Sequence, residues 1–151
     1  MPGYSAARAA RKLGIKPDSV LMLLDAPAGW AVPDLPAGVD VRWTADDMPD
    51  PDQPADPANT YCRPDVVLAF ARTAAVLHER IGLLATVIYP AGAVWIAWPR
   101  KAGGHVSDMT ENLIREVALP LGLVDNKVAA IDDDWSGLRL SWRRELRRSY
   151  R

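Results

Sequence analysis

The feature that most constrains the fold of this chain is the order of elements predicted between Gly92 and Trp142. An unbroken apolar run, Gly92–Trp98, is followed by a basic loop that contains glycines, a helix that begins at Asp108 or Thr110, and two short strands. Apolar runs of this length are typical of strands buried on both faces, as in parallel sheets. The order is that of one half of a doubly wound α/β domain, in which ligands bind at the carboxyl ends of the strands.

The rest of the sequence extends this pattern with three more strands and two more helices. Right-handed crossovers make the first four strands parallel and place helices on both faces. The final hairpin, Asp125–Asp132 with Leu138–Arg144, adds antiparallel strands. The predicted fold class is therefore α/β, a Rossmann-like three-layer sandwich whose mostly parallel sheet ends in an antiparallel hairpin. The upstream elements are predicted as helix Ala6–Leu13, strands Ser19–Asp25, Val39–Trp43 and Asp65–Phe70, and a helix from Thr73 to Ile88.

Length and composition indicate one domain, residues 1–151, with two unusual segments. Residues 45–64 interleave aspartates with prolines. They bury too little apolar surface to offset the entropy of ordering, so we expect a mobile acidic loop. Residues 145–151 form a basic tail. Because the formal net charge is −1, nothing draws the whole chain to nucleic acid, and we favour a solvated tail or pairing with the acidic loop.

The sequence indicates a cytoplasmic protein. A single cysteine, Cys62, excludes an internal disulfide and suits a reducing compartment. The first residues lack the apolar core of a signal peptide, and no apolar run approaches the roughly 20 residues of a membrane-spanning helix. We expect no membrane association and a monomer or homodimer.

The first candidate site is the loop Asp25–Trp30, at the carboxyl end of the first strand. A nucleotide or S-adenosylmethionine site there usually holds several glycines, so that the backbone approaches the ligand. Only Gly29 is present, and Pro27 lacks an N–H donor. Trp43 ends the second strand where a ribose-binding acid is expected. A structural turn is favoured over a cofactor site, with Asp25 and Gly29 as the ligand-binding candidates.

The second candidate is the loop that starts at Trp98. Two cations, flexible glycines and a following helix N-terminus together favour an anion. An arginine can grip a phosphate or carboxylate through two donors, whereas a lysine acts as a point charge. The alternative is a solvated connection in which Thr110 only caps the helix. The residues that would bind a small anion or nucleotide are Trp98, Arg100, Lys101, Gly103, Gly104 and Thr110.

The third candidate is Asp132–Gly137, which joins the last two strands. Adjacent acids can bind a divalent cation, but successive side chains in a strand diverge, so we expect no metal site. The simplest interpretation is a tight turn in which Gly137 supplies a positive φ. A further possibility is a protein contact centred on an exposed Trp135.

Two resemblances follow from these patterns. The element order resembles the S-adenosylmethionine-dependent methyltransferase fold, shortened by one strand–helix unit where residues 45–64 stand. The chain also resembles a family of small bacterial proteins, domain of unknown function family 3052. That resemblance implies a methyltransferase-like fold, brings no established activity and carries over no catalytic residue. Its motifs are GYSAARAARKLGIKP (Gly3–Pro17), LLDAPAGW (Leu23–Trp30), LPAGV (Leu35–Val39), DVVLAF (Asp65–Phe70), WIAWPRKAGG with DMTEN (Trp95–Asn112) and REVALPLGLVDNKVAAIDDDWSGLRL (Arg115–Leu140).

These observations favour binding over catalysis. No serine lies in a G-x-S-x-G elbow, and no catalytic dyad is evident. We expect a non-catalytic domain that binds a small anion or a protein partner between the first and fourth strands. The alternatives are an S-adenosylmethionine-dependent methyltransferase with an altered glycine loop, and a regulatory protein that uses Trp135 and the basic tail on a protein or nucleic acid.

Overall fold

The protein is built on one six-stranded sheet, seen in a computed structural model that describes residues 9–43, 64–89, 91–101, 104, 107–132 and 134–147. The strand order is β2-β1-β3-β4-β6-β5. β2, β1, β3 and β4 are parallel, and β6 and β5 add an antiparallel hairpin. The predicted fold class is therefore confirmed. The strands are β1 (Val20–Leu24), β2 (Asp40–Trp43), β3 (Val66–Phe70), β4 (Ala93–Pro99), β5 (Leu123–Ala130) and β6 (Trp135–Trp142).

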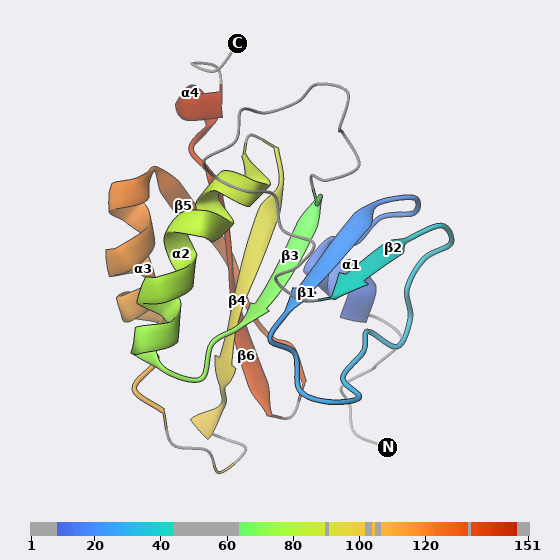
Figure 1. The fold of residues 1–151 in the computed structure, drawn as a ribbon, viewed down its shortest axis with the longest axis horizontal. Helices are drawn as coiled ribbons and strands as arrows, with labels where there is room; N and C mark the ends of the chain where they lie inside the picture. The colour runs from blue at the N-terminus through green and yellow to red at the C-terminus, as the bar shows by residue number, and fades with distance from the viewer. Residues whose placement is uncertain are drawn as a thin grey trace.

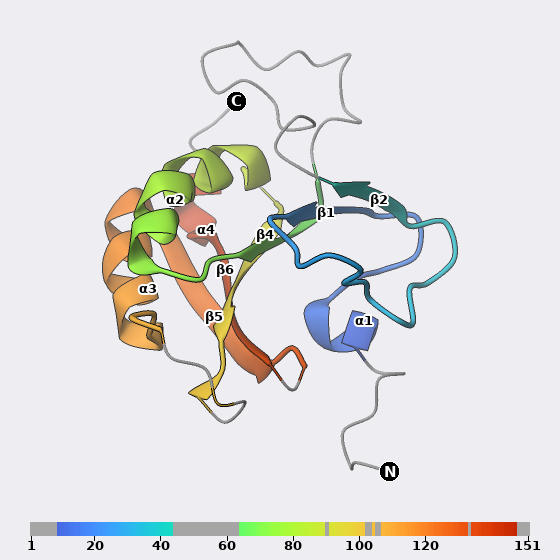
Figure 2. The same ribbon diagram turned by 60° about the horizontal axis from the view of Figure 1, so that its bottom comes forward.

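Helices cover both faces of the sheet and make three layers (Figures 1 and 2). α2 (Ala74–Ile88) and α3 (Glu111–Ala118) pack on one face, and α1 (Ala9–Leu13) packs on the other with the long connection between β1 and β2. A 3-10 turn, Leu119–Leu121, follows α3, and α4 (Arg144–Arg147) follows β6. No helix in the described part of the chain is long and apolar enough to cross a membrane.

The centre of the sheet explains why β3 and β4 are unbroken apolar runs. Every residue of both strands is buried, because helices or loops cover both faces. Trp95 and Trp98 point to opposite faces, as their odd spacing predicts. Trp95 lies in the cluster under α1, and Trp98 lies in the cluster under α2 and α3.

α1 is too short to be stable alone and is fixed by contacts with distant strands. The buried Trp95 indole N–H donates to the carbonyl of Leu13 at 2.9 Å. Lys12 Nζ donates to the carbonyl of Ala130, and Lys127 Nζ donates to the carbonyl of Lys12, each at 3.0 Å. The bonds from Trp95 and Lys127 satisfy carbonyls at the C-terminal end of α1 that have no partner within the helix. They also tie α1 to the final hairpin.

The final hairpin differs from the prediction in its register and its turn. Its strands pair Ala130 with Ser136, so the turn is shorter and earlier than predicted. Gly137 lies inside β6 and is not among the glycines with positive φ. It is needed for space: a Cβ there would lie 2.6 Å from Ile131 Cδ1 and 2.9 Å from Trp95 Cε3. The prediction that Gly137 supplies a positive φ in the turn is therefore wrong.

Several predicted features lie outside the described residues. They are the first residues of the predicted helix Ala6–Leu13, the acidic loop up to residue 63, and the tail beyond residue 147. Gly14 follows α1 and Gly122 follows the 3-10 turn after α3, each in the left-handed conformation, with φ of 79° and 103°. Thr110, one of two predicted caps, is the residue that caps α3.

Two glycines with opposite surroundings test the packing of the sheet. We expect Gly137→Ala to destabilise the protein by about 1–3 kcal/mol, because the added methyl group overpacks the Trp95 layer. Gly82→Ala is the matched control: in α2 the added Cβ meets nothing within 4 Å, so it should stabilise by about 0.5–1 kcal/mol. Chemical unfolding measures both values. Equal effects of the two substitutions would contradict the role assigned to Gly137.

The ion pair between α3 and β5 gives stability a pH dependence. Arg115 Nε donates to Asp125 Oδ2 at 2.9 Å, and this hydrogen bond holds the pKa of Asp125 below its ordinary value of about 3.9. A carboxylate with a lowered pKa stabilises the fold above that ordinary pKa, and the contribution is lost as the pH falls through the folded-state pKa. Asp125→Asn should therefore lower the Tm at pH 7, with a difference that shrinks below about pH 4. Glu111→Gln is the control, since Glu111 lies 3.8 Å from the same guanidinium and should matter less.

Candidate functional site

The candidate site lies at the carboxyl ends of β1, β3 and β4. From β1 the chain moves to β2 on one side and then returns to β3 on the other. In open α/β sheets, ligands bind outside the carboxyl ends of the strands at such a switch point. Three connections leave this end of the sheet: the loop after β1, the β3–α2 connection and the loop after β4 (Figure 2).

Asp25 ends β1 in a strained conformation. Its φ is 59°, in the left-handed region that non-glycine residues rarely adopt. Its carboxylate lies 3.5 Å from Arg80 Nη2 on α2, with side-chain exposures of 43% and 31%. Arg80 Nε is buried and has no hydrogen-bond partner within the described residues. Because the pair is partly exposed, its attraction contributes little to stability.

The loop after β1 turns back over the end of β3. Gly29 has a φ of 77°, and Trp30 N donates to the carbonyl of Pro27 at 3.0 Å, which closes a tight turn. The Trp30 ring then packs edge-on against Phe70, with ring centroids 4.9 Å apart. Its indole Nε1 donates to Asp132 Oδ2 at 2.9 Å. The switch point is thus covered by a side chain of the chain itself.

Asp132 connects three separate segments through four hydrogen bonds. Its Oδ1 accepts from the backbone N–H groups of Asp134 and Trp135, which shapes the hairpin turn. Its Oδ2 accepts from Trp30, and its carbonyl accepts from Arg100 Nη1 at 3.0 Å. The residue predicted as one of three possible metal-binding acids therefore acts as an anchor. Among the described residues, no group of three or more histidines, cysteines or acids could hold a metal ion.

The loop after β4 is fastened to the same turn. Arg100 N donates to the carbonyl of Asp134 at 2.8 Å, in addition to the guanidinium bond to Asp132. Lys101 is exposed, and Gly104 has a φ of 84° and donates to the carbonyl of Lys101. Gly103 lies outside the described residues. Arg100 thus holds the loop after β4 to the hairpin turn. Lys101 is the exposed cation of this loop, which was predicted to bind an anion.

The structure brings some predicted site residues together and separates others. Asp132 joins the Trp30 loop to Arg100. β3 lies between β1 and β4. The first and fourth strands are therefore not neighbours, and the predicted position of the crevice between them is wrong. Trp98 packs on the α2 and α3 face, and Thr110 Oγ1 accepts from Leu113 N at 3.1 Å as the cap of α3. Neither reaches the Asp132 turn through a described contact.

Trp135 is buried, so the prediction of an exposed tryptophan that anchors a protein contact is wrong. It is 5% exposed. Its ring packs edge-on against Phe70 at 4.9 Å, and the Arg72 guanidinium lies 4.9 Å from the centroid on its outer side. Trp30, Phe70 and Trp135 form one aromatic cluster across the carboxyl ends of the strands. Such edge-on pairs add stability beyond the burial of area.

The N-terminus of α2, which begins directly after β3, is occupied by protein groups. Thr73 Oγ1 accepts from Val76 N at 3.3 Å, and Asp108 Oδ1 accepts from Ala74 N at 2.8 Å. Ser107 Oγ donates to the carbonyl of Arg72, which fixes the approach of this loop. The backbone N–H groups of Ala74 and Val76, which helix N-termini can offer to a phosphate, are therefore already satisfied.

Sequence reasoning missed Phe70, Arg72 and Arg80 as site residues and misjudged Asp132. Phe70 is the last residue of a buried strand that the sequence did predict. Its position at the carboxyl end of this strand could have identified it as a site residue. The roles of Arg80 and Asp132 depend on contacts with residues 55 and 102 positions away, which no local pattern contains.

The fold is similar to that of known methyltransferases. A SAM-dependent methyltransferase from Aquifex aeolicus matches with a TM-score of 0.60 and 12% identity over 91% of this chain and 89% of that one. A fibrillarin pre-rRNA processing protein of Methanococcus jannaschii matches at 0.58, with 18% identity over 94% and 76%. A ribosomal protein L11 methylase from Lactobacillus delbrueckii subsp. bulgaricus matches at 0.58, with 16% identity over 91% and 77%.

The chain has a methyltransferase-like fold. No family model matches it, and no curated protein matches its sequence. The resemblance to domain of unknown function family 3052 therefore stays a prediction.

The described residues at the switch point do not fit S-adenosylmethionine. In the loop after β1, Asp25 stands at a positive φ and Pro27 offers no N–H. The space above β3 is covered by the Trp30 ring, which both Phe70 and Asp132 hold in place. A cofactor here would require Trp30 to leave its hydrogen bond and its aromatic contact.

A double-mutant cycle measures the bond that covers the site. Trp30→Phe keeps the ring contact with Phe70 but removes the N–H donor, and Asp132→Asn keeps an oxygen for the hairpin turn. We expect each change to destabilise by about 1–2 kcal/mol, with a coupling energy of about 1 kcal/mol, because a hydrogen bond to a charged group is lost. Glu116→Gln, on an exposed position of α3, is the neutral control. If the two substitutions changed the free energy of unfolding additively, the hydrogen bond between Trp30 and Asp132 would be contradicted.

Proposed function

We propose that this chain is a non-catalytic binding domain on a methyltransferase-like fold, in which the crevice that the fold uses for a ligand is filled by the chain itself. The observation that carries the proposal is the Trp30 indole, bonded to Asp132 and packed on Phe70 directly above the switch point. The cytoplasmic location and membership of domain family 3052 are part of this proposal and rest on the sequence alone.

The energetics support a filled crevice rather than a flexible cover. Removing Trp30 from its place would break one hydrogen bond to a carboxylate, worth about 1.5–3 kcal/mol, and one edge-on aromatic contact, worth about 0.5–1.5 kcal/mol. A ligand would have to supply this free energy before it gained any affinity. The protein groups that already satisfy the N-terminus of α2 raise the cost for any ligand that carries a phosphate.

The second candidate is an S-adenosylmethionine-dependent methyltransferase with an altered glycine loop. The similarity of fold to methyltransferases, over most of both chains, favours it. It requires a state in which Trp30 is displaced and the β1 loop opens. The third candidate, a regulatory protein that uses Trp135, loses its anchor because that ring is buried. The basic tail alone then remains for contact with a protein or nucleic acid.

Thermal unfolding with adenosyl compounds separates the first two candidates. Ligand at about 100 times its Kd stabilises a protein by roughly 2.7 kcal/mol, which is readily detected. We expect no shift of the Tm with S-adenosylmethionine or S-adenosylhomocysteine up to millimolar concentrations. Trp30→Ala is the companion variant, because it removes the cover and tests whether the space beneath accepts the compounds. A saturable shift of the unmodified protein would contradict the proposal and support the methyltransferase.

A further inference from the structure

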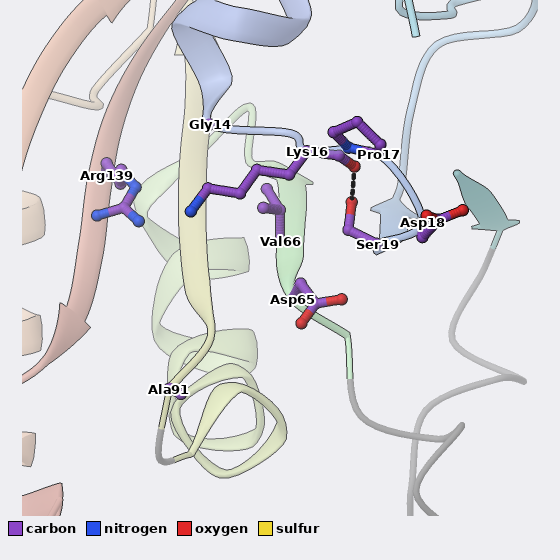
Figure 3. A pocket seen from close by; sticks show the side chains of 9 residues that line it. All are labelled: Gly14, Lys16, Pro17, Asp18, Ser19, Asp65, Val66, Ala91 and Arg139. Atoms are coloured by element: carbon purple, nitrogen blue, oxygen red, sulfur yellow. Dashed lines mark hydrogen bonds between the residues drawn. The ribbon is translucent and has the colours of Figure 1, made fainter. Parts of the chain in front are cut away.

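A pocket lies at the opposite end of the sheet, where the parallel strands begin. Its volume is about 380 Å³, which falls within the range of about 300–1,000 Å³ typical of small-molecule sites. Figure 3 shows how it forms between the turn after α1, the first residues of β1 and β3, and the side of β6. Its lining includes Gly14, Lys16, Ser19, Asp65, Val66 and Arg139.

The charges around this pocket are arranged unevenly. The Lys16 side chain extends toward Arg139, while Asp65 and Ser19 lie on the other side (Figure 3). The cations come from segments more than 100 residues apart, and the sheet pairing of Arg139 with Trp95 places it beside the α1 layer. Lys16 and Arg139 give this side of the pocket a local positive charge, which favours an anionic ligand.

The polar groups of the pocket differ in the hydrogen bonds that they already make. Arg139 Nη1 donates to Asn126 Oδ1 at 2.7 Å, which fixes the guanidinium on the β5–β6 side. Asp65 Oδ2 accepts from Val20 N at 2.8 Å, and its other carboxylate oxygen accepts no hydrogen bond among the described residues. The Lys16 ammonium has no ion pair or hydrogen bond within the described part of the chain, although its carbonyl accepts from Ser19 Oγ at 2.7 Å.

These positions are rigid. Asp65 caps the start of the sheet: its backbone N–H donates to the carbonyl of Val20, and its carbonyl accepts from Ala93 N. Gly14, with a φ of 79°, turns the chain out of α1 so that Lys16 faces β3 and β6. The backbone of the pocket is thus held by strands and by a fixed turn, which limits the entropy lost on binding to side chains such as that of the exposed Lys16.

We propose that this pocket binds a small carboxylate or phosphate that also carries an amino or hydroxyl group. The anionic group contacts Lys16 and Arg139, and the donor group contacts the free oxygen of Asp65. The inference deepens the proposed binding role and rests on it, since it names the ligand class of a domain that binds without catalysis. It places the ligand at the amino ends of the strands, away from the crevice filled by Trp30.

Binding of O-phosphoserine and inorganic phosphate at constant ionic strength tests this proposal. Saturable stabilisation in thermal unfolding is expected for both, and O-phosphoserine should bind more tightly because its amino group meets Asp65. Lys16→Met should weaken binding at least tenfold without a loss of stability, because Lys16 is exposed. Lys101→Met is the matched control: it removes an exposed lysine from the loop after β4, at the other end of the sheet.

Backbone amide resonances provide a readout that does not depend on stability. O-phosphoserine should shift the signals of Lys16, Ser19 and Val66 and leave that of Gly104 in place. The proposal is overturned if neither probe binds, or if Lys101→Met abolishes binding while Lys16→Met does not. Adenosyl compounds that bind at the Trp30 crevice would contradict the proposed function instead, and the positions of the shifted amides distinguish the two failures.

Discussion

The carboxylate of Asp132 makes the interactions on which the loops at the carboxyl end of the sheet depend. One oxygen shapes the turn of the final hairpin, and the other holds the indole of Trp30 from the far side of the sheet. The carbonyl of the same residue holds Arg100. Without this anchor, the loops after β1 and β4 would lack a common attachment, because β3 separates their strands. The aromatic cluster of Trp30, Phe70 and Trp135 is assembled around it.

This arrangement changes what a methyltransferase-like sheet offers at its two ends. At the carboxyl end, the Trp30 ring lies against Phe70 at the switch point, and the caps of α2 accept from the N–H groups of Ala74 and Val76. At the amino end, a pocket remains with two converging cations and a carboxylate. The described pocket therefore lies at the end of the sheet opposite to the switch point.

The sequence was sufficient to predict the architecture because the relevant signals are local. Unbroken apolar runs identified β1, β3 and β4, and a capping threonine marked the start of α3. The role of Gly137 could not be predicted, since it depends on Trp95, 42 residues earlier, and not on the turn beside it. The same limit applied to Trp135: its burial follows from Phe70 and Arg72, which a hairpin pattern does not reveal.

The most direct test of the account is the NMR signal of the Trp30 indole N–H, assigned by its disappearance in Trp30→Phe. The account predicts slow exchange of this proton with solvent, because it is bonded to Asp132 and covered by the aromatic cluster, and no change when S-adenosylhomocysteine is added. Rapid solvent exchange, together with a saturable shift on addition of that compound, would show an open crevice and contradict the account.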